Sequence, residues 1–564
     1  MKVTIDNHEL LAQTGETILD LIIREQMDTQ TLATRPLAAK IAGEVFTLNY
    51  VPVREEDGAS GSTIRRAMRV SNGRIRLLKY SDPAGKDVYT RTACFVVFLA
   101  IRELWPECTA KISCTLGNSV YICVNDSAFD VSRLKEKVQE KIDENFSLKR
   151  RRVMRETAIE KFTERGQLDK AALLRWIDSE SCYEYYYHDF SDYFYGEMLP
   201  STGYLTVWDI FPAKNGFILS YPDDLAPDQP STLTDMPSFF NVFSEGERWG
   251  KLMECETVAD LNQLTSTGEI RELIRVNEAL HEKRFSQIAD TISTRNVKVV
   301  MLAGPSSSGK TTSANRLATQ LRVYGKKPIL MSLDNYYLDR DKILPGPDGK
   351  LDLEHINTID TQLFRDHMSE LFRGREVELP KFNFRTGRRE WTGKHLRLTD
   401  DSVIIVEGIH GLNPTLIPEG MDHGEIFRLY VSPLLPLNLD NHNRIPTSYL
   451  RLLRRIVRDF ETRGSSVQRT ISMWESVRNG EKRWIFPYQE NADTILNSST
   501  LYELAVLKQH VYPLLKEIGP EDDCYDDVQA IVKILDYVVA SDVDDEIPPT
   551  SIVREFIGGN KFYR

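Results

Sequence analysis

Gly304-Pro305-Ser306-Ser307-Ser308-Gly309-Lys310-Thr311 has the glycine, lysine and threonine spacing of a phosphate-binding loop. The apolar segment before it, 297–303, is typical of a buried strand, and 311–321 after it has a helical pattern. Backbone N–H groups of such a loop can wrap a polyphosphate, and the start of the following helix adds positive potential. The sequence therefore predicts that this chain binds a nucleoside triphosphate.

The side chains of the loop have different expected roles. Lys310 should reach the β- and γ-phosphates, and the Thr311 hydroxyl should hold Mg²⁺. A chance turn rich in glycine and serine is the alternative, which the combination of strand, spacing and helix disfavours. The residues expected to contact the nucleotide are Gly304, Pro305, Ser306, Ser307, Ser308, Gly309, Lys310, Thr311 and Thr312.

From residue 296 onward, apolar segments alternate with helical patterns. Buried parallel strands of a doubly wound α/β sheet have this appearance. We therefore expect one α/β domain over 296–540. Its predicted strands are 297–303, 328–333, 402–407, 427–432 and 494–497.

Two of these strands end in a carboxylate. Asp334 follows 328–333, and Glu407 closes 402–407. Because ligands bind at the carboxyl ends of parallel strands, Asp334 could accept a proton from a substrate hydroxyl and also contact Mg²⁺. Glu407 is a candidate metal ligand. Each could be a solvated acidic turn, but two such ends behind a phosphate loop favour a catalytic site.

A group of arginines follows at helical spacing. Arg451, Arg454, Arg455 and Arg458 share one face of a predicted helix. Such a face can close over a triphosphate and neutralise the charge that develops during phosphoryl transfer. An exposed helix that pairs with acids is the alternative.

These motifs resemble the uridine–cytidine kinase family in order and spacing over about 296 to 515. The resemblance implies transfer of the γ-phosphoryl group of ATP or GTP to the 5′-hydroxyl of a nucleoside, with Mg²⁺. It makes Asp334 the general base and places Thr311 and Glu407 beside Mg²⁺. The motifs that carry it are the phosphate loop, Asp334-Asn335-Tyr336-Tyr337, Leu379-Pro380-Lys381-Phe382-Asn383-Phe384, Val406-Glu407-Gly408-Ile409, and Arg454-Arg455-Ile456-Val457-Arg458-Asp459 with Arg463-Gly464.

The same resemblance assigns the substrate side of the site. Arg455 and Arg458 belong to the lid and the substrate clamp, and Tyr337 lines the nucleoside pocket. The family's ribose-binding acid lies in a stretch that here reads Leu351-Asp352-Leu353-Glu354-His355-Ile356, where Glu354 is favoured and Asp352 stays open. Ser465 replaces a lid arginine, so Arg463 or Arg469 takes that role.

The segment that reads the base departs from the family pattern. Phe382 replaces a tyrosine, Asn383 an aspartate and Gly387 a histidine, whereas Phe384 is kept. Because a site that hydrogen-bonds a base edge discriminates strongly, these changes leave the identity of the nucleoside open. A kinase of another small alcohol, similar to phosphoribulokinase, is one alternative. An RNA-binding regulator with a nucleotide switch is another.

Residues 1 to about 240 resemble the N-terminal part of threonyl-tRNA synthetase, an α+β region. Residues 1–55 resemble its small TGS module, and 56–240 its second additional domain, through Tyr89 to Phe95, Glu103 to Pro106 and Phe194 to Gly203. The metal-binding positions of that domain fall at Thr92, Val96, Phe194 and Met198, none of which is a strong Zn²⁺ ligand. We expect a binding or regulatory module for RNA or a small ligand, without metal chemistry.

Three further segments complete the expected organisation. Residues 241–295 are predicted to form a helical connector, and 541–564 an acidic tail. Residues 131–163 are highly charged and predicted to be helical. The basic cluster in that last range is either a solvated face or an RNA contact, and consists of Lys149, Arg150, Arg151, Arg152 and Arg155.

Composition limits the function classes. The chain has 564 residues, too many for one hydrophobic core, and a net charge of -12 that argues against a protein dominated by nucleic-acid binding. Its 7 cysteines are scattered without a Cys-x-x-Cys pair, as expected for reduced thiols. No apolar run in the sequence is long enough to span a membrane. We therefore expect a cytoplasmic protein that contacts no membrane, and a homo-oligomer is open.

Overall fold

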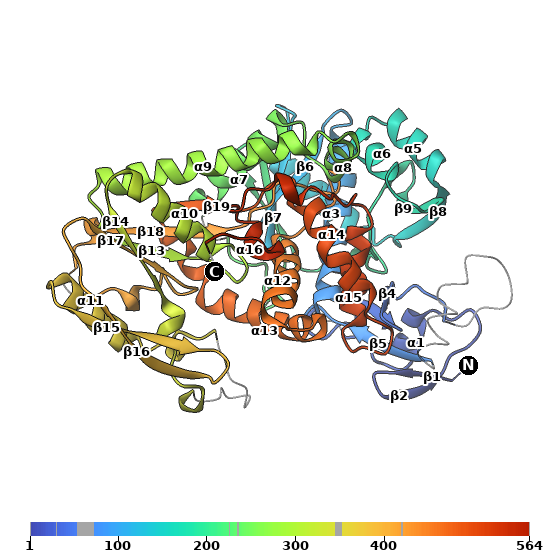
Figure 1. The fold of residues 1–564 in the computed structure, drawn as a ribbon. Coiled ribbons are helices and arrows are strands. Elements are labelled where there is room, and N and C mark those ends of the chain that lie inside the picture. Colours follow the sequence, from blue (N-terminus) through green and yellow to red (C-terminus); the bar gives the residue numbers. More distant parts are fainter. Residues whose placement is uncertain are drawn as a thin grey trace.

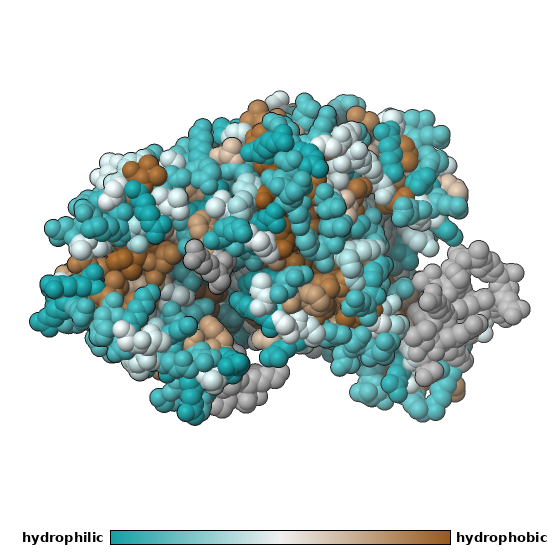
Figure 2. All heavy atoms as spheres, viewed as in Figure 1, coloured by the Kyte–Doolittle hydropathy of each residue, from teal (hydrophilic) through white to brown (hydrophobic). Residues whose placement is uncertain are grey.

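The computed structural model describes residues 2–29, 31–52, 71, 73–224, 226–233, 236–343, 352, 354–418 and 421–562. In Figure 1 the N-terminal elements lie at one end of the molecule and the sheet of the C-terminal half at the other, with the long helix α9 (Ile270–Thr294) along one side. Hydrophilic side chains cover most of the face in Figure 2, with separate apolar patches between them. Among the described residues, no helix has the length and apolarity needed to cross a bilayer.

A sheet in the order β2-β1-β5-β3-β4 forms the N-terminal module. Thr17 begins α1 with a capping box, in which its hydroxyl accepts the Asp20 N–H at 3.0 Å. The sheet includes β5, so it extends beyond residue 55, the predicted end of the module. That predicted boundary lies within 53–70, outside the described residues. The elements are β1 (Lys2–Ile5), β2 (His8–Leu11), α1 (Ile18–Arg24), β3 (Ala38–Ile41), β4 (Glu44–Phe46) and β5 (Arg74–Leu78).

The second module is built around the buried helix α3 (Pro83–Leu104). The predicted helix end at Trp105 is confirmed, because the Trp105 N–H makes the last helical bond, to the Ile101 carbonyl at 2.8 Å. The strand pair predicted around Gly117 is also present, as β6 and β7. The strands form the sheets β11-β12-β7-β6 and β10-β9-β8. The other elements are β6 (Ala110–Leu116), β7 (Ser119–Val124), α4 (Val131–Asp143), β8 (Lys149–Met154), α5 (Arg155–Glu164), α6 (Leu168–Leu174), β9 (Ser181–Tyr187), β10 (Phe190–Asp192), β11 (Asp209–Ala213) and β12 (Gly216–Ser220).

The prediction of a continuous helical region over 131–163 is wrong, because strand β8 interrupts it between α4 and α5. β8 pairs with β9, and its arginines are held across the sheet. Arg150 forms an ion pair with Glu197 at 2.5 Å, and Arg151 forms one with the fully buried Glu184 at 2.5 Å. Acid partners distant in sequence therefore account for part of the basic cluster.

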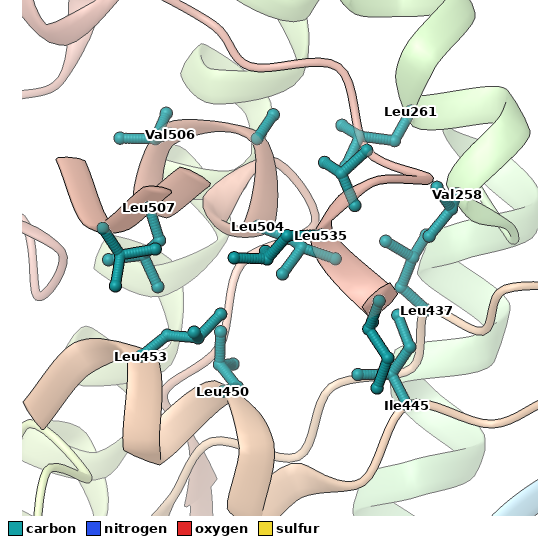
Figure 3. Close-up of a cluster of buried hydrophobic side chains, with 14 of the residues drawn as sticks. Val258, Leu261, Leu437, Ile445, Leu450, Leu453, Leu504, Val506, Leu507 and Leu535 are labelled. Atoms are coloured by element: carbon teal, nitrogen blue, oxygen red, sulfur yellow. The ribbon is translucent and has the colours of Figure 1, made fainter. Parts of the chain in front are cut away.

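The connector is helical, as predicted, and it shares a core with the C-terminal half. Figure 3 shows Val258 and Leu261 from the connector facing a cluster that contains Leu450, Leu453 and Leu504. Burial of this apolar surface fixes the connector against the helices that follow the α/β sheet. The connector helices are α7 (Pro237–Leu252), α8 (Val258–Thr267) and α9 (Ile270–Thr294), and the helices of the C-terminal half that meet them are α12 (Thr447–Arg463), α14 (Glu503–Lys516) and α15 (Tyr525–Leu535).

The α/β domain has a parallel sheet in the order β14-β17-β13-β18-β19, and all five predicted strands are present. Helices α9 and α10 cover one face of the sheet, and α11 covers the other. The sheet is thus doubly wound, as the apolar strands predicted. The elements are β13 (Val299–Ala303), α10 (Lys310–Val323), β14 (Lys327–Ser332), α11 (Thr361–Phe372), β15 (Val377–Asn383), β16 (Arg388–Leu396), β17 (Ser402–Glu407), β18 (Ile426–Ser432), α13 (Val467–Trp484), β19 (Thr494–Asn497) and α16 (Arg554–Ile557).

The segment after residue 540 is packed rather than a free tail. Ile552 and Phe556 are fully buried and belong to the core between the sheet and α9. Figure 1 shows the C-terminus beside α16 and α12, near the middle of the molecule. Because the segment is rich in acidic residues, the sequence predicted a tail and did not indicate the few apolar residues that anchor it.

Candidate active site

The predicted phosphate loop is the turn between β13 and α10. Two glycines are needed there for different reasons. A Cβ at Gly304 would lie 2.1 Å from the Val431 carbonyl oxygen, and Gly309 has a φ of +85°. Ser307 also has a positive φ, of 58°. The Lys310 ammonium lies over the loop and donates to the Pro305 carbonyl at 3.0 Å.

Helices α12 and α13 hold the loop from outside. The Ser306 N–H donates to Glu481 at 3.0 Å, and the Ser306 carbonyl accepts from Arg451 at 3.1 Å. The Ser306 hydroxyl meets Arg455 at 3.0 Å, and the Ser307 carbonyl accepts from Arg454 at 3.2 Å. The outward-facing polar groups of the loop are thus paired with side chains of these two helices.

The expectation that Arg451 and Arg454 face the triphosphate is therefore wrong. Both guanidinium groups are buried, where Arg451 pairs with Glu481 and Arg454 with Glu503. The two acids lie on α13 and α14, outside any motif. A charge can stay buried when it is paired and hydrogen-bonded, which is the case for both arginines.

The other predicted arginines lie nearer the reacting groups. Arg455 contacts the Ser306 hydroxyl, and its charge acts on Glu354. Arg458 donates to Asp459 at 2.8 Å, and its positive charge adds to burial, the main cause, in lowering the pKa of Lys310. The charge of the exposed Arg463 opposes a rise in the Asp334 pKa. All three therefore act electrostatically on the site.

Asp334 and Glu407 lie together at the carboxyl edge of the sheet. In the parallel ladders, Glu407 lies opposite Leu302 of β13 and Ser332 of β14. Burial and the nearby Asp334 charge raise the pKa of Glu407 to about 7. Burial also raises the pKa of Asp334, against the Lys310 charge. The Thr311 hydroxyl and these two carboxylates are all oxygen donors, which suits Mg²⁺.

A wall of aromatic rings lies next to the turn that carries Asp334. The Tyr337 ring lies edge-on to Phe382, with centroids 5.5 Å apart, and 6.3 Å from Phe384. The Asn335 side-chain amide oxygen accepts the Phe382 N–H at 3.2 Å and so joins this wall to the Asp334 turn. Phe384 is 56% exposed, so one ring of the wall is accessible.

The structure separates the two candidate ribose-binding acids. Asp352 accepts a hydrogen bond from the Trp484 indole at 3.0 Å and caps the Glu354 N–H at 3.2 Å. Glu354 packs against Gly480, and its pKa is raised to about 7 by burial and by Glu481, while Arg455 and Lys310 oppose the rise. Glu354 is thus the acid in the field of the phosphate-loop groups.

Three residues of this region were not predicted from the sequence. Glu481 lies in no motif, and Glu555 lies in the predicted tail. His410 follows Glu407 by three residues and is 1% exposed, and burial lowers its pKa to about 4. The Glu354 backbone faces the His410 ring and opposes this lowering of the pKa. The only sequence signal for His410 is its closeness to Glu407.

In the second module, the four positions at which the sequence predicts a lost metal site come together in one apolar core. Thr92, Val96, Phe194 and Met198 are all buried. The Thr92 hydroxyl donates to the Val88 carbonyl at 2.8 Å and accepts the Leu199 N–H at 3.0 Å. Within the described ranges, no three His, Cys, Asp or Glu side chains are grouped to hold a metal ion.

Comparison with known proteins places the α/β domain. The phosphoribulokinase/uridine kinase family model matches residues 299–504. A uridine kinase of Vibrio atlanticus is 30% identical over 223 residues, which are 39% of this chain and 96% of the relative. A uridine kinase of Aliivibrio salmonicida is 30% identical over 229 residues, covering 40% and 98%.

Two solved structures also match part of the chain. A possible uridine kinase from Bacillus stearothermophilus is 18% identical, with a TM-score of 0.27, and covers 38% of this chain and 97% of that protein. A D-glycerate 3-kinase from Cryptococcus neoformans is 16% identical, with a TM-score of 0.20, covering 49% and 89%. The coverage of the uridine kinases and the P-loop site together show that the C-terminal part of this chain belongs to the phosphoribulokinase/uridine kinase family.

Proposed function

We propose that the α/β domain transfers the γ-phosphoryl group of ATP or GTP to the 5′-hydroxyl of a nucleoside. The observation that carries the proposal is that one site combines a phosphate loop, a base candidate at Asp334 and an aromatic wall. The buried acid Glu354 adds a group suited to ribose hydroxyls. The names of the two uridine kinases that are 30% identical agree with a nucleoside substrate.

In the proposed reaction, Asp334 accepts the proton of the attacking hydroxyl. The new bond joins that oxygen to the γ-phosphorus, and the bond between the γ-phosphorus and the leaving nucleoside diphosphate breaks. Lys310, Arg455 and Arg458 stabilise the charge on the transferred group. Thr311, Asp334 and Glu407 would hold Mg²⁺, which neutralises phosphate charge when it is bound.

The nucleobase is expected to contact aromatic rings more than polar side chains. Asn383, which replaces the family's aspartate, already accepts the Arg385 N–H at 3.1 Å and donates to Glu390 at 2.9 Å. Gly387 has no side chain, and Arg340 packs against it. Because Phe382 and Phe384 offer only apolar surface, we propose that the site tolerates several bases.

A panel of acceptors tests this proposal. With ATP and Mg²⁺, at least one ribonucleoside or deoxyribonucleoside should raise the rate of ADP release by about 100-fold or more over the rate without acceptor. Ribulose 5-phosphate should have no such effect. Stimulation by ribulose 5-phosphate alone would favour the alternative of a kinase that acts on another small alcohol. If no acceptor raised the rate, the RNA-binding regulator with a nucleotide switch would become the favoured function.

The raised pKa of Glu354 predicts a pH-dependent KM for the nucleoside. A carboxylate accepts ribose hydroxyls, and with a pKa of about 7 Glu354 loses that form as the pH falls through neutrality. The KM should therefore rise by up to about tenfold per pH unit below pH 7 and level off above it. Glu354→Gln should raise KM and abolish this dependence.

Asp352→Asn is the matched control for this prediction. Because the Asp352 carboxylate already accepts a hydrogen bond from the Trp484 indole, that variant should keep the pH dependence of the wild type. Initial rates at several nucleoside concentrations between pH 5.5 and 8.5 measure both effects. If Asp352→Asn lost the dependence and Glu354→Gln kept it, the assignment of the two acids would be reversed.

We further propose that the N-terminal modules bind RNA or a small ligand and regulate the kinase domain. The arginines of β8 are near tyrosine rings, with Arg150 4.4 Å from the Tyr183 ring centroid. Aromatic and arginine side chains stack on the bases in proteins that bind single-stranded nucleic acids. Binding of labelled RNA that weakens steeply with salt would support this role.

A further inference from the structure

The last described segment of the chain brings a carboxylate to the phosphate loop. Glu555 accepts the backbone N–H of Thr312 at 3.0 Å, and the Asn560 amide donates to the Thr312 hydroxyl at 3.1 Å. Ile552 packs so closely that a Cβ on Gly309 would lie 2.5 Å from its Cγ2. The segment therefore contacts the loop on both sides of Lys310.

The Thr312 N–H is one of the donors that helix α10 offers to an anion. The helix begins at Lys310 with Gly309 as its N-cap, and the Ser313 N–H bonds back to the Gly309 carbonyl at 3.0 Å. The N–H groups before Ser313 belong to the first turn, where a helix end binds phosphate. The Glu555 carboxylate thus lies where a phosphate group is favoured.

The Glu555 charge also acts on two groups of the proposed active site. It contributes to the raised pKa of Glu407 and favours the charged form of Lys310. A polyphosphate that approaches Lys310 would meet this negative charge in a partly buried site, where repulsion is stronger than in water. The carboxylate therefore opposes binding of a phosphate group.

The backbone around Glu555 is fixed, whereas its side chain is partly exposed. Ile552 and Phe556 are buried, and the Ser551 hydroxyl donates to Glu278 at 2.7 Å. The Arg454 guanidinium lies 4.8 Å from the Phe556 ring centroid. The carboxylate can consequently leave Thr312 by rotation of its own side chain while the segment stays in place.

We propose that Glu555 sets the nucleotide affinity of the site by competing with phosphate for the Thr312 N–H. The residue lies outside the range 299–504 that matches the family model, so the device belongs to this chain's own C-terminal segment. Nucleotide binding displaces the carboxylate. The inference rests on the proposed function, because it requires a nucleoside triphosphate at the loop.

Calorimetric titration of the full chain with ATP and Mg²⁺ tests the inference. Glu555→Gln removes the charge, keeps the shape, and should lower the Kd for ATP by about tenfold at low salt, with a smaller effect at high salt. Asp545→Asn is the matched control, because this carboxylate of the same segment is 76% exposed, and it should leave Kd within about twofold. Glu555→Ala, checked by circular dichroism, repeats the test if the glutamine variant folds poorly.

The outcomes separate this inference from the function on which it rests. An equal Kd in wild type and Glu555→Gln would overturn the competition and leave ATP binding intact. Weaker binding by the variant would also overturn it, by showing that the carboxylate contacts the nucleotide. If ATP bound to neither protein, the proposed function itself would fail and take the inference with it.

Discussion

Replacing Asp334 with asparagine is expected to lower kcat by about 10²- to 10⁴-fold, the usual contribution of a positioned general base. Asparagine keeps the shape of the side chain but cannot accept the proton of the attacking hydroxyl. The position of Asp334 after β14, close to Lys310 and Glu407, is the reason for so large an effect. Because burial raises its pKa, Asp334 is a stronger base than a free carboxylate.

Initial rates of ADP formation, together with the Kd for ATP, measure this effect. The Kd should change by less than about threefold, since the phosphate loop supplies most contacts to the nucleotide. Asp341→Asn is the control, because that carboxylate follows seven residues later and its side chain is 65% exposed. A kcat within twofold of the wild type in Asp334→Asn would contradict the assignment of the base.

Arg454→Met should destabilise the protein by about 3–5 kcal/mol, the cost of leaving one charge of a buried pair without its partner. Both Arg454 and Glu503 are fully buried, and their second contact is 2.7 Å long. Arg454 also donates to the Ser498 carbonyl at 2.8 Å and to Ser307 of the phosphate loop. The substitution therefore removes support from the loop as well as stability.

Urea-induced unfolding, followed by circular dichroism, measures this loss. Arg454→Met with Glu503→Leu should recover a large part of it, because no unpaired charge then remains in the core. Arg388→Met is a matched control, since the Arg388 side chain is 69% exposed. A loss below about 1 kcal/mol in Arg454→Met would mean that the buried pair is not required.

The sequence predicted the α/β domain well because its signals are local. Apolar strands gave the parallel sheet, and the position of Asp334 and Glu407 at strand ends placed both at its carboxyl edge. The order of the strands was not predictable, because no local pattern encodes which strands become neighbours.

Contacts distant in sequence explain the errors. Arg451 and Arg454 have the same helical spacing as Arg455, so the sequence pattern does not distinguish them. Arg451 and Arg454 are buried because each pairs with an acid on a later helix, Glu481 and Glu503 respectively. The Asp352 carboxylate meets the Trp484 indole, more than a hundred residues later in the chain, and no local pattern indicates that contact.

Two boundaries were missed for a related reason. Strand β5 joins the N-terminal sheet from beyond residue 55 through parallel pairing with β1, and turn signals do not reveal such a crossover. In the C-terminal segment, Ile552 and Phe556 are too few to give a periodic pattern, although they are fully buried. The contact of Glu555 with Thr312 followed only from the structure.

Identification of the phosphorylated product tests the central claim most directly. The full chain is incubated with ATP, Mg²⁺ and the most active nucleoside, or with its 5′-deoxy analogue, and the products are assigned by ³¹P NMR and mass spectrometry. We expect a nucleoside 5′-monophosphate from the nucleoside and no phosphorylated product from the analogue. A product phosphorylated at another position, or equal turnover of the analogue, would contradict the account.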